Sequence, residues 1–323
     1  MDSIPRHSRG IRRQWLRSAV AMAVAAASPL VFSDVCPAAG SPGEMATIAL
    51  IEKKADIATE DFRDYWRDLH GTLAVRIPGF WTYTQYHLGD ELSGSADSSA
   101  AAAAIHGLAE VTYCREADIA GLASSAVTEL IKADEQNAFA GTYLYGTRRG
   151  DSVTHVAVEA AVSPLDLDTG GTLLVLVAGG DGDDAAVFRQ RLGGAVAALA
   201  GRCPAIQWAR SHVFQPYQAD AWQAPHVNHH PDVIYDAALE LRFADRDRAV
   251  ACLSTSLLGA LMERPGATVS VYPVHGRYQM VRDGRPTVLG LRGLPAYRLM
   301  EKLGAANQAS PAVLDVLYGA GNE

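Results

Sequence analysis

The pattern of apolar and polar residues predicts a regular succession of strands and helices in the first half of the chain. Apolar residues at positions 62, 65, 66, 69 and 73 have the spacing of one face of an amphipathic helix. Thr59 is expected to cap this helix, and Pro78-Gly79 to stop it. Short apolar or alternating runs on either side have the length and composition of strands. Four strands are predicted at 46–52, 80–88, 108–114 and 142–146, and a second helix at 118–132.

This order of elements is the βαββαβ arrangement of ferredoxin-like folds, and the chain repeats it. Shifted by 126 positions, residues 48–51 fall on 174–177, and shifted by 130 positions, residues 110–113 fall on 240–243. Repetition of the same elements in the same order indicates an internal duplication. The sequence therefore predicts an α+β protein with two ferredoxin-like units. The expected parts are an N-terminal segment at 1–44, a first unit at 45–150, and a second unit at 151–323 that ends in closing helices at 292–305 and 311–318.

Composition and charge narrow the class of protein. The chain has 323 residues, 49% of them hydrophobic and 20% charged, which is enough to build a sizeable core. The net charge of -8, with no lysine-rich or arginine-rich run after the N-terminus, argues against nucleic-acid binding. The four cysteines (Cys36, Cys114, Cys203 and Cys252) include no Cys-x-x-Cys pair, so neither a disulfide framework nor a zinc site is expected. Cys114 and Cys252 lie in apolar contexts and are expected to fill the core.

Residues 1–44 allow two interpretations. Arg12-Arg13 followed by the uncharged stretch 18–32 is typical of a twin-arginine export signal, and this stretch is too short for a comfortable membrane span. Alternatively, Met45 is the functional start, because it opens directly onto the first strand, and residues 1–44 are an extension without a fold. We expect a cytoplasmic protein, with export as the alternative.

One segment of the first unit, FRDYWRDLHGTLAVRIPGFWTYTQYHL at 62–88, gathers aromatic and titratable side chains. It resembles the EthD family of the dimeric α+β barrel superfamily. The resemblance covers about a third of the chain and is absent from the second unit, and Thr72 stands where the family usually has proline. The matching positions are Tyr65-Trp66, His70-Gly71, Leu73-Ala74, Ile77-Pro78-Gly79, Tyr83, Gln85 and His87.

The resemblance implies that the two units pair their sheets into a barrel within one chain, as an intrachain pseudo-dimer. It also implies a role in the breakdown or tailoring of small organic molecules. Members of the family are linked to ether degradation beside an oxygenase system, and to dehydration or decarboxylation of polyketide-type aromatics. The expected partner is a hydrophobic, aromatic or carbonyl-bearing small molecule, and the protein is expected to be a monomer or a homodimer.

The candidate site is built from this segment. His70 is the expected general base or acid, because histidine exchanges protons near neutral pH. Tyr65 and Tyr83 can donate hydrogen bonds to a developing enolate or phenolate oxygen. Gln85 and His87 alternate on one strand face and are expected to point into the barrel. Substrate contacts are predicted for Trp66, Gln85, His87 and Tyr113. The second unit has Arg191, Leu192 and Val196 where the first has Tyr65, Trp66 and His70, so a single site is expected, between the first helix, the second strand and the opposing sheet.

Dehydration, decarboxylation and cofactor-free oxygenation all begin with such a proton transfer, and no cofactor is predicted. Two other functions stay open. One is a haem-binding oxidoreductase with His87, His212 or His226 as axial ligand, since related barrels house haem. The other is a non-catalytic accessory protein of an oxygenase system. No metal site is predicted, because the loop with His226, His229 and His230 has no carboxylate partner. Trp208, His212 and Trp222 are expected to pack inside the second unit.

Overall fold

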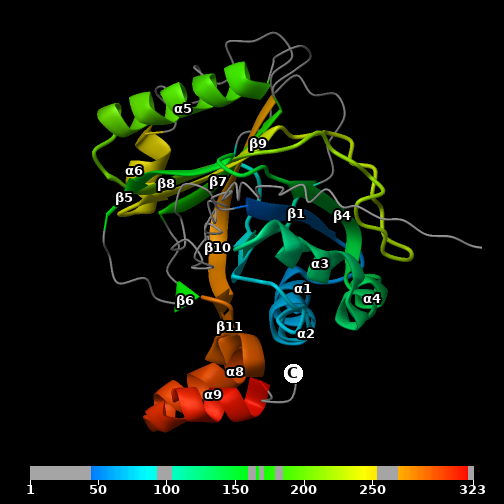
Figure 1. Cartoon of the computed structure of the whole chain (residues 1–323). Coiled ribbons are helices and arrows are strands. Elements are labelled where there is room, and N and C mark those ends of the chain that lie inside the picture. The colour runs from blue at the N-terminus through cyan, green and yellow to red at the C-terminus, as the bar shows by residue number, and fades with distance from the viewer. Residues whose placement is uncertain are drawn as a thin grey trace, which may run out of the picture. The chain divides into compact units, whose positions relative to one another are not determined.

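An antiparallel sheet of eleven strands dominates the described part of the chain and curls around a core to which both halves contribute (Figure 1). This computed structural model describes residues 45–92, 104–158, 165–166, 171–178, 185–252 and 268–318. They all belong to one compact unit, which spans residues 36–323. The export signal or extension predicted at residues 1–44 lies outside the described residues.

The first half forms the predicted succession of strands and helices, with two differences in its helices. Ala58, not Thr59, precedes the first helix. The predicted second helix is broken at Ser125, whose backbone is extended and whose hydroxyl accepts a hydrogen bond from the Thr128 amide. The elements are β1 (Met45–Lys53), α1 (Thr59–Tyr65), the π-helical turn η1 (Trp66–His70), α2 (Gly71–Ala74), β2 (Thr82–Leu88), β3 (Gly107–Tyr113), η2 (Glu116–Asp118), α3 (Ile119–Ser124), α4 (Ala126–Glu135) and β4 (Phe139–Gly146).

The second half repeats the succession and adds three short strands and the closing helices. Its repeat consists of β7 (Thr172–Ala178), α5 (Ala185–Arg202), β8 (Ile206–Val213), β9 (Ala237–Phe243), α6 (Arg246–Cys252) and β10 (Thr268–Arg282). The additions are β5 (Ser152–Ala157), β6 (Leu165–Asp166), β11 (Arg285–Pro286), α8 (Val288–Leu303), η4 (Ala306–Ala309) and α9 (Pro311–Tyr318). Helix α8 kinks at Gly293, where Asp68 of η1 accepts a hydrogen bond from the Leu294 amide at 2.7 Å.

The strand order establishes the fold class. The first four strands lie in the order β4-β1-β3-β2, and the repeat lies in the order β10-β7-β9-β8. Each is the order of a ferredoxin-like unit. Strand β10 joins them, because its residues 268–273 pair with β7 and its residues 274–281 pair with β2. The protein is therefore an α+β protein in which two ferredoxin-like units form a barrel within one chain, as predicted.

The second seam of the barrel is closed by a segment without regular structure. Residues 214–236, called the closing segment below, connect β8 to β9 and run beside the free edge of β4. The Gln215 amide donates to the Gly146 carbonyl at 2.8 Å, and the Asn228 amide donates to the Ala140 carbonyl at 2.8 Å. The Thr142 amide donates in return to the Asn228 carbonyl at 3.0 Å. The closing segment thereby brings residues of the second half onto the first.

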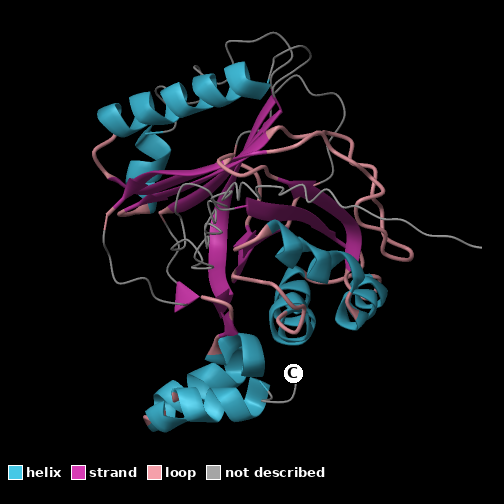
Figure 2. Ribbon diagram, in the orientation of Figure 1, coloured by secondary structure: helices cyan, strands magenta, loops and turns pink. Residues whose placement is uncertain are grey.

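Helices cover the outer face of each half-sheet, and the inner faces pack on each other (Figure 2). Helix α5 and helix α6 lie on the β7–β10 strands, whereas α1 to α4 lie on β1–β4 (Figure 1). Between the half-sheets, buried side chains from both halves form a single cluster that includes Ile48, Leu50, Tyr86, Leu176 and Tyr272. No helix of the described residues is long and apolar enough to cross a membrane.

The cysteines differ from the sequence expectation. Cys203, at the end of the α5 region, forms a disulfide with Cys252 at the end of α6. Cys114 is also disulfide-bonded. The expectation that the cysteines form no disulfide framework is therefore wrong. Cys203 and Cys252 are 49 positions apart, carry no spacing signal and meet only because α5 and α6 pack on the same face of the sheet. Cys252 also packs against the core cluster of the second half, as expected.

Candidate active site

The π-helical turn η1 decides which side chains of the first helix face the sheet. The predicted apolar face included Leu69, but Leu69 is 60% exposed, while Trp66 and His70 are buried. A π-turn closes its hydrogen bond one residue later than an α-turn, and it therefore shifts the following residues around the helix axis. The shift turns Leu69 outward and brings His70 onto the sheet-facing side with Trp66. Gly107 of β3 makes room for Trp66, because a Cβ there would lie 2.4 Å from the indole ring.

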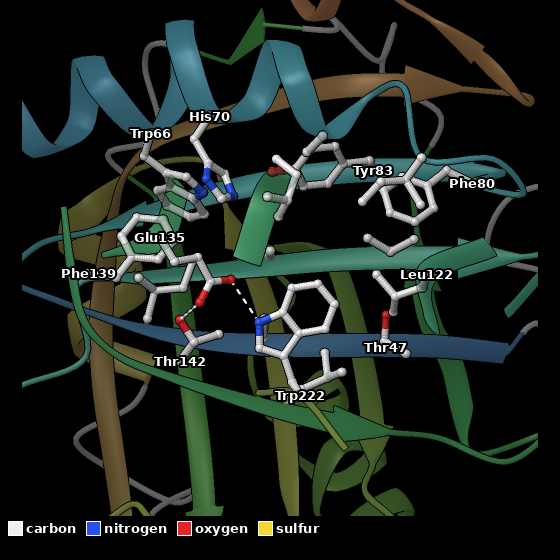
Figure 3. Close-up of a pocket in the computed structure, with 18 residues that line it drawn as sticks. Thr47, Trp66, His70, Phe80, Tyr83, Leu122, Glu135, Phe139, Thr142 and Trp222 are labelled. Carbon is white, nitrogen blue, oxygen red and sulfur yellow. Dashed lines mark hydrogen bonds between the residues drawn. The ribbon is translucent and has the colours of Figure 1, made fainter. Parts of the chain in front are cut away.

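Beneath this turn lies a cavity of about 70 Å³, called the inner cavity below. It is enclosed by η1, α2 and α4 on one side and by β1–β4 on the other, and Figure 3 shows its side chains. Most of the lining is aliphatic or aromatic, and three side chains on it can exchange protons: His70, Tyr83 and Glu135. The remaining lining residues are Thr47, Ala49, Ile51, Trp66, Ala74, Ile77, Phe80, Ala109, Val111, Leu122, Ile131, Phe139, Thr142, Leu144 and Trp222.

His70 is held in one orientation by a carboxylate behind it. Its Nδ1 lies 2.9 Å from Oδ2 of Asp134. Burial alone would raise the pKa of Asp134, but hydrogen bonds from His70 and Tyr65 lower it below its ordinary value. Asp134 is thus an ionised acceptor near neutral pH, so Nδ1 of His70 carries the proton and donates it. His70 lines the inner cavity, and in a neutral imidazole whose Nδ1 donates to Asp134, Nε2 has the lone pair that can accept a proton.

Glu135 faces His70 across the inner cavity (Figure 3). Its side chain is only 3% exposed. The Thr142 hydroxyl donates to Oε2 at 2.9 Å, and the Trp222 indole N–H donates to Oε1 at 2.9 Å. Burial raises the pKa of Glu135, and the opposing effects of His70 and of these hydrogen bonds are smaller. Glu135 therefore keeps its proton to a higher pH than an ordinary glutamate.

The inner cavity brings together three of the predicted site residues, namely His70, Tyr83 and Trp66. The Tyr83 hydroxyl accepts a hydrogen bond from Gln85 Nε2 at 2.7 Å, which leaves its own proton for another acceptor. Burial raises the pKa of Tyr83, so the phenol stays protonated at neutral pH. Trp66 forms an apolar wall beside Phe139, with its ring 0% exposed.

The other four predicted residues lie directly behind lining residues. Tyr65 donates to Asp134 Oδ1 at 2.6 Å, and burial together with this hydrogen bond raises its pKa to about 12. Gln85 contacts the Tyr83 hydroxyl, as described above. His87 stacks on Trp66 with ring centroids 4.6 Å apart. The Tyr113 hydroxyl lies 3.1 Å from Thr47 Oγ1. None of these four side chains lines the inner cavity.

The expectation that Gln85 and His87 point into the barrel is wrong. Gln85 Nε2 donates to the Trp66 carbonyl, and His87 packs on the Trp66 ring, so both face the helices on the outside of the sheet. The side chain of Tyr86, which points the opposite way, belongs to the core between the half-sheets. The inner cavity consequently lies between helices and sheet, not against the opposing sheet.

The histidines proposed for haem or metal are placed elsewhere. His87 is fully buried, and burial together with nearby Arg67 lowers its pKa well below the ordinary value. His212 is buried near Ser152 and Glu110, and His226 is exposed. None of the three lines the inner cavity. In the histidine-rich loop, both ring nitrogens of His229 contact backbone groups, and the described residues contain no group of three potential metal ligands.

Asp134, Glu135 and Trp222 were missed by the sequence reasoning. One local signal was present for the two acids, because they end helix α4, where the helix dipole disfavours negative charge. Two adjacent carboxylates at the end of a helix do not stabilise that helix, so they indicate a role in binding or catalysis. Trp222 carried no comparable signal. It was expected to pack inside the second unit, whereas the closing segment carries it into the inner cavity of the first.

Comparison with known proteins gives one family match. Residues 54–142 match the family described as EthD domain. No curated protein matches the chain in sequence. Three crystal structures show a distant likeness that bears on neither the reaction nor the substrate. A candidate monooxygenase from Lactobacillus acidophilus has 10% sequence identity and a TM-score of 0.43, and the match covers 74% of this chain and 97% of the other. A candidate monooxygenase from Fusobacterium nucleatum has 8% identity and a TM-score of 0.45, with 74% of this chain and 96% of the other covered. An anthrone oxidase-like protein has 10% identity and a TM-score of 0.46, with 76% of this chain and 96% of the other covered.

The matched range begins just after β1 and ends at Thr142 in β4. It includes His70, Tyr83 and Glu135, the three side chains of the inner cavity that exchange protons, as well as Asp134 behind His70. The chain therefore matches the EthD domain over residues 54–142, and these candidate site residues lie within the matched range.

Proposed function

We propose that this protein is an enzyme of small-molecule catabolism or tailoring that starts its reaction by proton transfer at His70. The substrate is a hydrophobic aromatic or carbonyl compound. The observation that carries the proposal is the hydrogen bond between His70 and Asp134, which leaves Nε2 of His70 facing an apolar cavity that also contains Glu135. A base oriented by a carboxylate, opposite an acid with a raised pKa, is an arrangement suited to acid–base catalysis.

In the first step, His70 Nε2 removes a proton from a carbon beside a carbonyl group, or from a phenol. The electron pair of the broken bond moves onto the substrate oxygen, and the Tyr83 hydroxyl donates a hydrogen bond to that oxygen. Asp134 stabilises the imidazolium that forms, and Tyr65 holds Asp134 in place from behind. This step needs no cofactor.

The second step distinguishes the candidate reactions. In a dehydration, protonated Glu135 gives its proton to a leaving hydroxyl group, and water departs as the double bond forms. In a decarboxylation, the proton goes to the carbon that loses carbon dioxide. In a cofactor-free oxygenation, the carbanion gives its electron pair to dioxygen, a C–O bond forms, and the resulting peroxide anion takes a proton from the His70 imidazolium to become a hydroperoxide. The raised pKa of Glu135 favours the reactions in which an acid delivers a proton.

Hydrogen–deuterium exchange tests the first step without knowledge of the second. The wild-type protein and the His70→Ala variant are incubated in D2O with a panel of aromatic ketones and phenols, and NMR follows the loss of acidic C–H signals. General-base catalysis contributes on the order of 100-fold or more, so His70→Ala should lose at least about 100-fold in exchange rate. The matched control is His226→Ala, which removes an exposed histidine outside the cavity. Equal exchange by the wild type and His70→Ala would remove His70 from the mechanism, and saturable binding without exchange would favour the accessory role.

A further inference from the structure

A second cavity opens next to the inner cavity. It has a volume of about 670 Å³ and lies between α3, α4, β4 and the closing segment; it is called the vestibule below. The two cavities share four lining residues, so they are neighbours across one wall. The shared residues are Thr47, Leu122, Leu144 and Trp222.

The size of the inner cavity makes this wall important. A cavity of roughly 150 Å³ in a protein core is known to take up benzene. The inner cavity, at about 70 Å³, is smaller than that. An aromatic substrate therefore needs more room than the inner cavity holds, and the vestibule is the neighbouring space that can supply it.

Trp222 is the side chain that can open the wall. It is 7% exposed and extends from a part of the closing segment without regular secondary structure. The backbone is anchored on both sides, at Gln215 to β4 and at Ala224 to His229 Nε2. Between these anchors, the indole is held by its hydrogen bond to Glu135 and by the Lys132 ammonium, 5.2 Å from the ring centroid. A rotation of the indole breaks its hydrogen bond to Glu135, its contact with Lys132 and its packing in the apolar cluster, but leaves the backbone anchors intact.

The charges of the vestibule point to the other end of the substrate. Lys132 lies at the wall, with its ammonium over Trp222 and 3.1 Å from Oε1 of the exposed Glu129. The exposed Arg148 lies two residues beyond the end of β4. Two cationic side chains thus line the vestibule together with one lining carboxylate, that of Asp220, and with Gln215 and Gln218 as neutral donors. A guanidinium and an ammonium at one opening bind carboxylates through charge-assisted hydrogen bonds.

From these observations we infer that the substrate is an aromatic carboxylate that occupies both cavities. Its ring displaces Trp222 and enters the inner cavity beside Trp66, and its carboxylate stays in the vestibule at Lys132 and Arg148. Trp222 acts as the gate between the two. The inference rests on the proposed function, which places the reaction in the inner cavity. It adds the class of substrate and the residues that select this class.

Calorimetric titration with two matched probes tests the assignment without turnover. The probes are 2-naphthoate and the uncharged 2-naphthamide. Wild-type protein should bind 2-naphthoate about 10-fold more tightly, as expected for a charge-assisted contact. The double variant Lys132→Gln/Arg148→Gln should lose this preference, whereas Arg149→Gln, which changes an exposed neighbour that does not line the vestibule, should keep it.

The gate is tested by stopped-flow association of 2-naphthoate. Removing the indole in Trp222→Ala should speed association by about 10-fold or more if opening limits entry. Three results would overturn the substrate class. They are no binding of either probe, equal affinity of the wild type for both probes, and an unchanged preference for 2-naphthoate in the double variant. An unchanged association rate in Trp222→Ala would overturn the gate. If the wild-type protein discriminates between the two probes but catalyses no exchange in D2O, the proposed reaction is contradicted and the substrate class is not.

Discussion

Asp134 and Glu135 are adjacent in the chain and have opposite pKa shifts. Asp134 receives hydrogen bonds from His70, Tyr65 and Asn137, which hold its pKa low despite partial burial. Glu135 is nearly fully buried beside apolar residues, which raises its pKa. Two neighbouring carboxyl groups with different environments can serve as a permanent anion and as a proton donor. The opposite pKa shifts therefore arise from the surroundings of each group, not from its chemical type.

The raised pKa of Glu135 predicts a pH-dependent contribution to stability. The folded state holds this proton more tightly than the unfolded chain, so the contribution is fully present below the ordinary pKa of 4.5 and is lost as pH rises through the folded-state pKa. Glu135→Gln removes the titration and keeps both hydrogen-bonding partners. The stability of Glu135→Gln relative to wild type should therefore increase from pH 4 to pH 7. The increase is about 1.4 kcal/mol for each tenfold difference in the affinity of Glu135 for its proton between the folded and the unfolded state.

Urea unfolding of both proteins at pH 4 and pH 7 measures this difference. Glu116→Gln, at an exposed glutamate that lines neither cavity, is the matched control and should follow the wild type at both pH values. A relative stability of Glu135→Gln that stays constant between the two pH values would show that Glu135 titrates alike in the folded and unfolded states.

Two elements without α-helical or strand geometry assemble the site. The π-turn η1 aims His70 at the sheet, and the closing segment delivers Trp222. The closing segment depends on His229, which is 6% exposed. The Ala224 amide donates to His229 Nε2 at 2.9 Å, and Nδ1 lies 3.0 Å from the Thr142 carbonyl. One imidazole thus ties the closing segment to itself and to β4.

Replacement of His229 should loosen the closing segment. His229→Ala leaves the buried Ala224 amide and Thr142 carbonyl without these partners, and an unsatisfied buried polar group costs about 1–3 kcal/mol. We expect a loss of that size in the free energy of unfolding by urea. The control is His230→Ala, at the exposed neighbouring histidine. Because surface substitutions usually have small effects, its free energy of unfolding should change by no more than about 0.5 kcal/mol. Equal stabilities of the two variants would mean that the closing segment is held by other contacts.

Large aromatic side chains and buried ion pairs pack between the half-sheets, inside the barrel. Tyrosines 86, 143, 145 and 272 occupy much of the space between the half-sheets. Buried ion pairs occupy more of it: Arg210 lies 3.1 Å from Glu110, and Arg242 lies 2.8 Å from Glu240. Arg242 and Arg277 hold the pKa of Glu240 below its ordinary value although burial opposes this, so the carboxylate remains ionised.

The disulfide between Cys203 and Cys252 should contribute strongly to stability. It joins two residues 49 positions apart in the sequence. A disulfide restricts the unfolded chain and typically adds 2–4 kcal/mol to the free energy of unfolding, and the length of this loop predicts about 4 kcal/mol. The double variant Cys203→Ser/Cys252→Ser should lose roughly that amount in the free energy of unfolding. Alkylation of the unreduced protein followed by mass spectrometry should find no free thiol at either position. Free thiols at both, or an equally stable double variant, would contradict the bond.

This bond also bears on the two interpretations of residues 1–44. Disulfides persist in oxidising compartments and are rare in the cytosol. Cys114 is disulfide-bonded as well, so three of the four cysteines lie in such bonds within the described residues. Both interpretations of residues 1–44 stay predictions, and N-terminal sequencing of the native protein distinguishes them.

The sequence by itself determined the order of elements, the duplication and the importance of the segment at 62–88. These features are local or repetitive, since periodicity and turn residues report directly on backbone conformation. Only the tertiary structure decided what completes the site. Asp134 lies 64 positions from His70, and Trp222 belongs to the other half of the chain. A strand such as 82–88, buried on both faces, carries no pattern that tells which face meets the helices, so Gln85 and His87 could be placed only by packing.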